Sequence, residues 1–198
     1  MRSLLKRLWR KNTAAQPKDF PSQEQIEQVW DGTPFLQHFH TVRAMVVGTD
    51  GPRIAGLSRD FLAAANTARE QGNTEAVIHF LCSFIAANLI IADFCSVASA
   101  LGNLALTYEQ LSKFEIASRL QHYALGLKLQ YGAPPEAIAR SLWLIGRSKA
   151  ALGQYADASE FFARSIAVQP SEKVFKQHEW IQHRIEEQKL TGELPPDL

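Results

Sequence analysis

The chain has 198 residues, of which 46% are hydrophobic and 21% are charged, and its formal net charge at pH 7 is +1. This composition excludes an intrinsically disordered chain and is typical of one or two folded domains. A net charge near zero also argues against a helical-repeat protein that binds nucleic acid, because such a binding face makes the whole domain basic.

Residues 1–19 are interpreted as a basic amphipathic N-terminal segment and its linker. The first eleven residues read MRSLLKRLWRK, a pattern typical of a helix that lies on a membrane surface or docks on a partner. The docking residues would be Leu4, Leu5, Lys6, Arg7, Leu8, Trp9 and Arg10. Two other interpretations remain open: an organelle-targeting segment within residues 1–18, and a basic tail that makes no specific contact. The apolar stretch of a secretory signal is missing.

Residues 20–56 are predicted to form a divergent helical pair followed by a loop. Phe35, Phe39 and Val42 have the spacing of one helical face. The stretch VVGTDGPRIAG at 46–56 is rich in glycine, which favours loops. It is therefore interpreted as the link to a more regular unit.

A period of 41 residues runs through residues 57–170. Small residues seven apart recur at each step, as Ala76 and Ser83, Ala117 and Ala124, and Ala158 and Ser165. Four residues after the first member stands Phe80, Gln121 or Phe162. A fixed period indicates stacked supersecondary units, and small residues let two helices approach closely. The sequence predicts three helix pairs whose closest approach lies at Ala76, Ala117 and Ala158.

The third unit resembles the tetratricopeptide repeat (TPR). The matching residues are Leu142, Ile145 and Gly146 in its first helix, Ala158 and Phe162 in its second, and Pro170 at its end. The usual repeat has about 34 residues, and the longer step here resembles the units of kinesin light chain type repeats, because the surplus is close to two helical turns. The resemblance implies an all-α fold, a right-handed superhelical stack of antiparallel helix pairs.

The stretch from Ala76 to Tyr108 is strongly apolar, and only His79 and Asp93 in it could carry charge. A transmembrane helix would need about 20 uninterrupted apolar residues, whereas Asn88 interrupts this stretch. It is predicted to form the central, most buried helices, with an integral membrane protein as the alternative. Cys82 and Cys95 are interpreted as reduced core residues of a cytosolic protein.

Residues 171–198 are predicted to form a capping helix and a tail. Val174, His178, Ile181 and Ile185 share one helical side, with charge elsewhere, and a terminal repeat needs such a polar-faced cap.

The chain is predicted not to be an enzyme, and no metal or cofactor is expected. His178 and His183 are five residues apart, whereas a helical zinc motif needs a spacing of four. No phosphate-binding loop, nucleophile elbow or paired-cysteine motif is present in the sequence. An enzyme that uses scattered carboxylates remains an alternative.

The resemblance implies a concave groove, lined by the first helices of successive units, that binds extended or helical peptides. The corresponding positions are Asn66, Arg69, Ser99, Asn103, Leu106, Gln110, Arg140, Trp143, Leu144 and Arg147. Asn66 and Asn103 are candidate contacts for a peptide backbone, because an amide both donates and accepts hydrogen bonds. Arg140 and Arg147 could hold an acidic side chain or a terminal carboxylate.

The predicted function is that of a cytoplasmic adaptor that binds a protein or peptide partner, with peripheral membrane contact if residues 1–11 act as a docking helix. Trp143 and Leu144 favour a ligand with an apolar anchor beside an acidic group. Alternatively, Trp143 packs against the neighbouring unit and the arginines only solvate the surface. A second functional class remains open, a chaperone or assembly factor that binds its client in the same groove.

Overall fold

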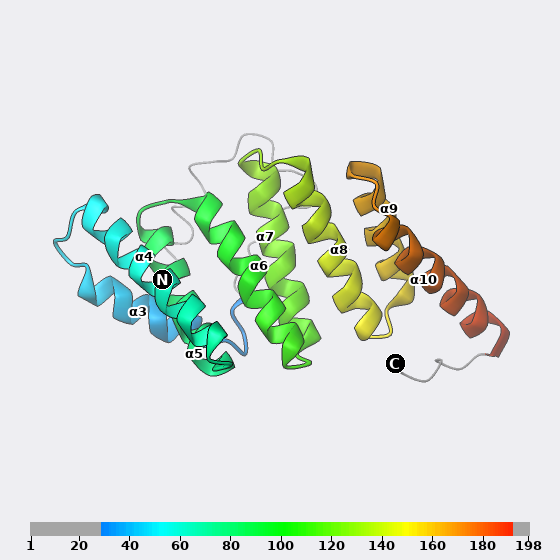
Figure 1. Ribbon diagram of the computed structural model, residues 1–198, viewed down its shortest axis with the longest axis horizontal. Helices are drawn as coiled ribbons and strands as arrows, with labels where there is room; N and C mark the ends of the chain where they lie inside the picture. The colour runs from blue at the N-terminus through cyan, green and yellow to red at the C-terminus, as the bar shows by residue number, and fades with distance from the viewer. Residues whose placement is uncertain (1–28, 192–198) are drawn as a thin grey trace.

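The computed structural model describes the backbone of residues 29–191 and the side chains of residues 29–187. The predicted docking segment, its linker and residues 192–198 of the predicted tail lie outside this range. Within it the chain is all-α, and its helices are α3 (Phe35–Met45), α4 (Gly51–Glu70), α5 (Thr74–Ile90), α6 (Phe94–Gln110), α7 (Phe114–Gln130), α8 (Pro135–Ala151), α9 (Tyr155–Val168) and α10 (Glu172–Thr191). Figure 1 shows them arranged along the long axis of the molecule.

The same turn ends five of these helices. The backbone has a positive φ at Gly72, Ala92, Ser112, Gly132 and Gly153. In each turn the N–H of the next residue donates to the carbonyl five residues earlier, at 2.9 Å. This hydrogen bond satisfies a helix-terminal carbonyl and reverses the chain. Connections of three or four residues result, so consecutive helices run antiparallel.

The start of α4 differs from the prediction, which placed a loop at 46–56. The carboxylate of Asp50 accepts a hydrogen bond from the N–H of Arg53 at 3.0 Å, and a proline stands in the first turn. Both features favour the beginning of a helix. The loop therefore ends at Asp50, and the first regular helix pair begins at Gly51 instead of residue 57.

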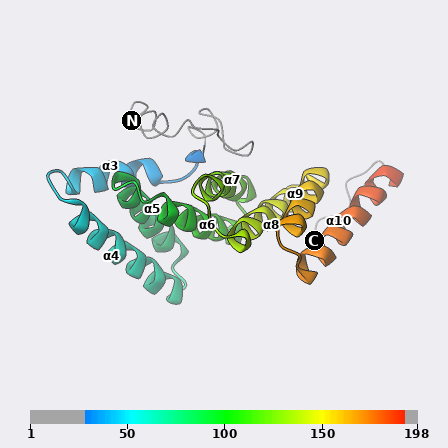
Figure 2. The ribbon, with the colours of Figure 1, turned by 90° about the horizontal axis from the view of Figure 1, so that it is seen from above.

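Three helix pairs form the body of the stack: α4 with α5, α6 with α7, and α8 with α9. Neighbouring pairs contact each other through α5 against α6 and α7 against α8, and α10 packs on α9 as the predicted cap. Figure 2 shows α5 and α7 on the same side as α3, with α4 on the opposite side. The first helices α4, α6 and α8 therefore present one face of the stack and the second helices the other.

The alignment of the first pair with the others is shifted by one residue from the predicted one. Helices α5, α7 and α9 begin at residues 74, 114 and 155, which gives steps of 40 and 41 residues. The shorter step arises because three residues connect α5 to α6, whereas four connect α7 to α8. Val77 (3% exposed) is thus the counterpart of Ala117 and Ala158, and the prediction that Ala76 marks the closest approach is wrong.

Helix α3 does not form a pair with α4, as the predicted divergent unit would require, but packs on α5. The residues before it extend this contact to α7. The indole of Trp30 stacks on Phe35 with ring centroids 3.6 Å apart and meets the ring of Tyr123 edge-on. Arg119 of α7 also donates a hydrogen bond to the backbone carbonyl of Asp31 at 2.7 Å.

This placement explains the apolar sequence of α5. Helices α3, α4 and α6 all pack on it, so residues on every side of α5 are buried, among them Leu81, Ile85 and Leu89. Among the helices described here, none is long and apolar enough to span a membrane. The expectation for the two cysteines holds for one of them, since Cys82 of α5 is buried but Cys95 of α6 is exposed.

A directed hydrogen-bond chain joins α3 to α5. The hydroxyl of Ser83 donates to the carbonyl of His79 at 3.1 Å, so it must accept from the Nδ1–H of His38, 2.8 Å away. The other ring nitrogen of His38 therefore carries no proton and accepts from Nδ1–H of His79 at 2.6 Å. The remaining nitrogen of His79 faces Glu75 at 3.8 Å. Both imidazoles are neutral in this arrangement, and a second proton on His38 would oppose two donors.

The free energy of unfolding is expected to fall as the pH drops below about 6.5, the ordinary pKa of histidine. Burial, followed by the nearby His79, lowers the pKa of His38 in the folded chain. Between the folded and unfolded pKa values the unfolded state binds more protons, so the stability contribution is present above the unfolded pKa and is lost on acidification. Urea denaturation of the wild type and His38→Gln at pH 5 and pH 7.5 measures this effect. An equal loss in both proteins would contradict the assignment to His38.

Candidate functional site

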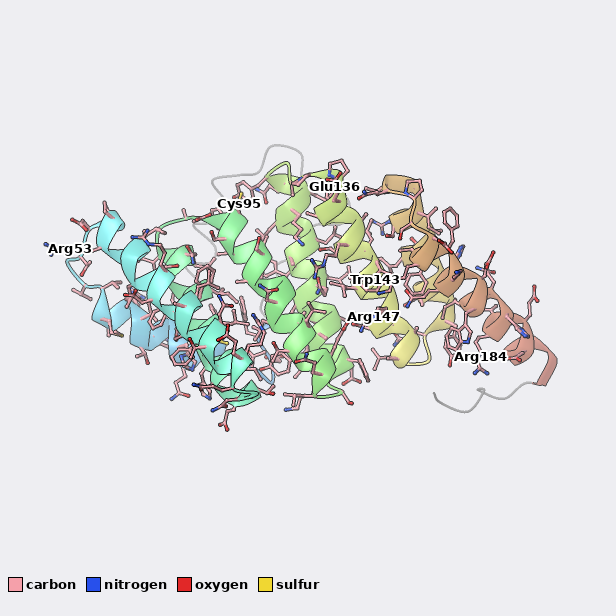
Figure 3. All side chains as sticks on the ribbon, viewed as in Figure 1. Arg53, Cys95, Glu136, Trp143, Arg147 and Arg184 are labelled. Carbon is pink, nitrogen blue, oxygen red and sulfur yellow. The ribbon has the colours of Figure 1, made fainter. Side chains whose placement is uncertain are left out.

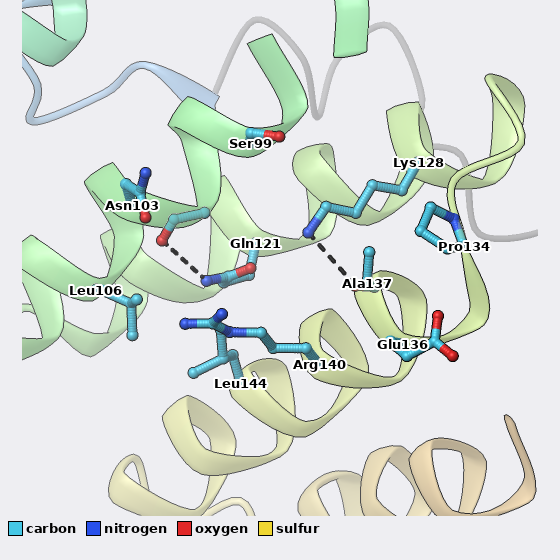
Figure 4. A pocket seen from close by; sticks show the side chains of 11 residues that line it. Ser99, Asn103, Leu106, Gln121, Lys128, Pro134, Glu136, Ala137, Arg140 and Leu144 are labelled. Atoms are coloured by element: carbon cyan, nitrogen blue, oxygen red, sulfur yellow. Dashed lines mark hydrogen bonds between the residues drawn. The ribbon is translucent and has the colours of Figure 1, made fainter. Parts of the chain in front are cut away.

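A pocket of about 390 Å³ opens between α6, α7 and α8 and is called the α6–α8 pocket. Its lining residues are Ser99, Gly102, Asn103, Leu106, Gln121, Lys128, Pro134, Glu136, Ala137, Arg140 and Leu144. Figure 4 shows their side chains entering from the three helices and from the α7–α8 connection. The pocket thus lies where two successive helix pairs meet.

Five of the ten predicted groove residues lie in this pocket: Ser99, Asn103, Leu106, Arg140 and Leu144. The sequence brings them together because α6 and α8 stand next to each other as the first helices of successive pairs. The side chains of Asn103 and Arg140 are exposed, whereas Leu144 is only 3% exposed and forms part of the wall. Ser99 already donates its hydroxyl to the carbonyl of Cys95 at 3.1 Å.

Two lining residues come from the second helix α7 and were not predicted. Lys128 donates from Nζ to the hydroxyl of Ser141 at 2.7 Å and to the carbonyl of Ala137 at 3.4 Å. Burial, followed by the charge of Arg140, lowers its pKa. Gln121 donates to the carbonyl of Gly102 at 3.3 Å. The one sequence signal for these contacts was Gln121 itself, a polar residue at a position where the third unit has Phe162.

Trp143, a predicted groove residue, links α8 to α10. Its indole N–H donates to the side-chain carbonyl of Gln177, and its ring lies 4.9 Å from the guanidinium of Arg147 and 4.6 Å from the ammonium of Lys173. It lines a second pocket of about 400 Å³ that also contains Arg140. Figure 3 shows Trp143 and Arg147 between α8 and α10. This geometry supports the alternative in which Trp143 packs against the neighbouring unit.

Arg147 lines a third and larger pocket, of about 690 Å³, between α8, α9 and α10, together with Glu109, Phe162 and Trp180. Its guanidinium donates to Glu109 at 3.1 Å, and the hydroxyl of Ser148 donates to the other oxygen of that carboxylate at 2.8 Å. Burial raises the pKa of Glu109, while Ser148 and Arg147 act in the opposite direction. Arg147 is 40% exposed, but it already has an anionic partner within the chain.

The other three predicted groove residues, Asn66, Arg69 and Gln110, line none of these three pockets. Arg69 donates to the amide oxygen of Asn66 at 3.1 Å on the exposed face of α4. That oxygen would have to exchange partners before it could accept from a peptide backbone. The assignment of Asn66 and Arg69 to a binding site stays a prediction.

The part of the chain that the structure describes holds no group of three or more histidine, cysteine or acidic side chains arranged to bind a metal ion. His178 instead contacts the hydroxyl of Ser159 at 3.0 Å, and His183 faces Glu187 at 3.7 Å. Both histidines of the HEWIQH segment thus have contacts within the stack of α9 and α10.

No model of a known protein family matches this sequence, and no curated protein matches it. Among solved structures, the N-terminal domain of stress-induced protein-1 (STI-1) from C. elegans is similar, with a TM-score of 0.56 and 16% sequence identity. The match covers 65% of this chain and 97% of that domain. The fold is TPR-like. The predicted all-α stack of TPR-like helix pairs is therefore confirmed, and the face of α6 and α8 corresponds to the first-helix face from which the groove was predicted.

Proposed function

We propose that this protein is a non-enzymatic adaptor that binds a peptide segment of a partner protein along the face of α6 and α8. The observation that carries the proposal is the α6–α8 pocket, which brings five independently predicted groove residues into one open site. Asn103 and Arg140 are the exposed polar members of this site. Neither of these two side chains makes a hydrogen bond or an ion pair within the described residues, so their donors are available to a ligand.

The composition of the pocket favours a peptide over a small apolar ligand. Leu106 and Leu144 provide an apolar wall beside the polar groups of Asn103 and Arg140. A peptide offers both kinds of group at once, an apolar side chain and a polar backbone, and extended segments commonly bind through such mixed surfaces. Steps of 40 and 41 residues between second helices also support long repeat units similar to those of kinesin light chain.

A chaperone or assembly factor that captures its client in the same groove is the second candidate. The pocket geometry favours neither class, because both would use the same contacts. We place the protein in the cytoplasm, and contact of the basic segment at 1–11 with a membrane surface remains part of the proposal. A stable stoichiometric complex would favour the adaptor, and transient capture of newly made client would favour the chaperone.

The test is affinity capture from native lysate with the wild type and the double variant Asn103→Ala, Arg140→Glu side by side, with bound proteins identified by mass spectrometry. A matched control carries Gln37→Ala and Arg43→Glu, which make the same chemical changes at exposed residues of α3. Circular dichroism should show equal helicity in all three proteins. We expect a partner that is held by the wild type and the control but lost by the pocket variant.

The same partners with all three proteins would contradict the groove assignment. Attention would then turn to the basic N-terminal segment and to the face of α3, α5 and α7. A partner that is confirmed should be tested as a purified peptide, so that direct binding is separated from capture through a third protein.

A further inference from the structure

The ammonium group of Lys128 lies in the α6–α8 pocket without a carboxylate partner. Its hydrogen bonds go to the hydroxyl of Ser141 and the carbonyl of Ala137, both neutral. No ion pair of the described residues includes Lys128 or Arg140, and the two positive charges repel each other enough to affect the ionisation of Lys128. A partly buried cation beside a second cation destabilises the folded chain unless an anion joins them.

Gln121 is a second polar group in the pocket that is not fully satisfied. Its side chain is 0% exposed, and its amide nitrogen donates to the carbonyl of Gly102. Its oxygen Oε1 is buried and has no hydrogen-bond donor among the described residues. A buried acceptor without a donor destabilises the fold. The equivalent positions of the other two pairs hold the apolar residues Leu81 and Phe162, so the repeat itself does not require a polar residue here.

These departures from the repeat pattern meet in one place. Figure 4 shows Lys128 from α7 and Arg140 from α8 reaching toward Gln121. Polar choices that cost stability and cluster at a single open pocket are expected where a protein binds a ligand. What the pocket lacks is an anion for the two cations and a hydrogen-bond donor near Gln121. Glu136 is the one acidic lining residue; it is exposed in the first turn of α8 and forms no ion pair with either cation in the described structure.

We propose that the α6–α8 pocket binds a carboxylate of a peptide, held between Lys128 and Arg140, with Gln121 as the acceptor for a nearby N–H. This inference rests on the proposed peptide-binding function and names the chemistry of the bound segment. A free inorganic anion would satisfy the cations but would bring no N–H donor and no side chain for Leu106 and Leu144. A peptide residue supplies all three groups: the carboxylate, the amide N–H and an apolar side chain.

The experiment uses the full-length chain with ¹³C-labelled lysine and four probe peptides. They are acetyl-Leu-Asp-Leu and acetyl-Leu-Asn-Leu, each with a free carboxyl terminus or with a terminal amide. The side-chain signal of Lys128, assigned by its loss in Lys128→Met, is followed by NMR during titration. We expect saturable shifts with the three peptides that carry a carboxylate and none with acetyl-Leu-Asn-Leu-amide. The comparison of the three separates a side-chain carboxylate from a terminal one.

Variants then test the roles of the residues by isothermal titration calorimetry. Lys128→Met is expected to weaken binding at least tenfold while the melting temperature stays equal to or above that of the wild type, because a cation without an anionic partner is removed. A merely structural lysine would show the reverse: a lower melting temperature and unchanged affinity. Gln121→Met, which keeps the shape without the acceptor, is expected to weaken binding. Glu136→Gln is expected to strengthen it by removing a negative charge from the rim.

Several outcomes would overturn the inference. Equal binding of the neutral peptide, unchanged affinity in Lys128→Met, or no shift of Lys128 with any probe at 10 mM would each be incompatible with a carboxylate site. The proposed function can fail separately. If Asn103→Ala, Arg140→Glu loses a captured partner while Lys128→Met retains it, the groove binds its partner by other contacts and only the carboxylate site is rejected.

Discussion

Gly146→Val is expected to lower the free energy of unfolding by about 3 kcal/mol, the upper part of the range for overpacked cores. A Cβ atom built at Gly146 would lie 2.7 Å from two ring carbons of Phe162, closer than such atoms approach in real structures. The ring cannot turn away, because Phe162 is only 2% exposed and fills the contact between α8 and α9. Urea denaturation followed by circular dichroism measures the change.

Gly102→Ala is the matched control, because Gly102 is also a helix-interior glycine on a first helix. A Cβ atom there would meet only the side-chain oxygen of Gln121, at 4.0 Å. Alanine should therefore stabilise α6 by about 0.5–1 kcal/mol through its better helix propensity. If Gly146→Val were as well tolerated as Gly102→Ala, the close approach between α8 and α9 would be wrong.

Trp30→Ala is expected to cost about 3–5 kcal/mol, the range for deleting a large buried aromatic side chain. The indole is 3% exposed and lies between Phe35 of α3 and Tyr123 of α7. Its removal leaves a cavity beneath the residues that hold α3 on the second-helix face. Hydrogen exchange in α3 and the urea midpoint of the whole chain together show whether α3 detaches alone or the stack unfolds with it.

Trp30→Phe distinguishes the ring contact from the polar group of the indole. The N–H of Trp30 is buried and has no acceptor within the described residues, so phenylalanine keeps the stacking and removes an unsatisfied donor. The expected loss is therefore less than about 1.5 kcal/mol. A loss as large as that of Trp30→Ala would mean that the N–H has an acceptor and that the ring contacts matter less.

The pairing of α6 with α7 and of α8 with α9 could be predicted from the sequence, because the spacing of Ala117, Ala158 and Phe162 records the contact between paired helices. The first pair was predicted one residue out of alignment. Its period depends on the length of the α5–α6 connection, and a fixed step carried backward from later units contains no information on that length. The position of α3 depends on Trp30, whose contact with Tyr123 joins residues far apart in the chain.

The pocket was predictable only in its first-helix half. Asn103 and Arg140 follow from helical periodicity, because residues on one face of α6 and α8 turn to the same side. Lys128 and Gln121 lie on α7, and their entry into the pocket depends on how α7 packs between its neighbours. The role of Trp143 depends on Gln177, which is 34 residues away on the capping helix. Such contacts follow from tertiary packing and leave no local signal in the sequence.

The layer that α3 adds on α5 makes the stack unequal along its length. Each unit of a repeat protein is stabilised by its own contacts and by those with its immediate neighbours. One end has an additional interface in the packing of α3 on α5, whereas at the other end α9 is covered by α8 and α10. Local opening should therefore require the least free energy toward α10 and the most around α5. A ligand at the α6–α8 pocket would sit between a rigid half and a half whose curvature it could adjust.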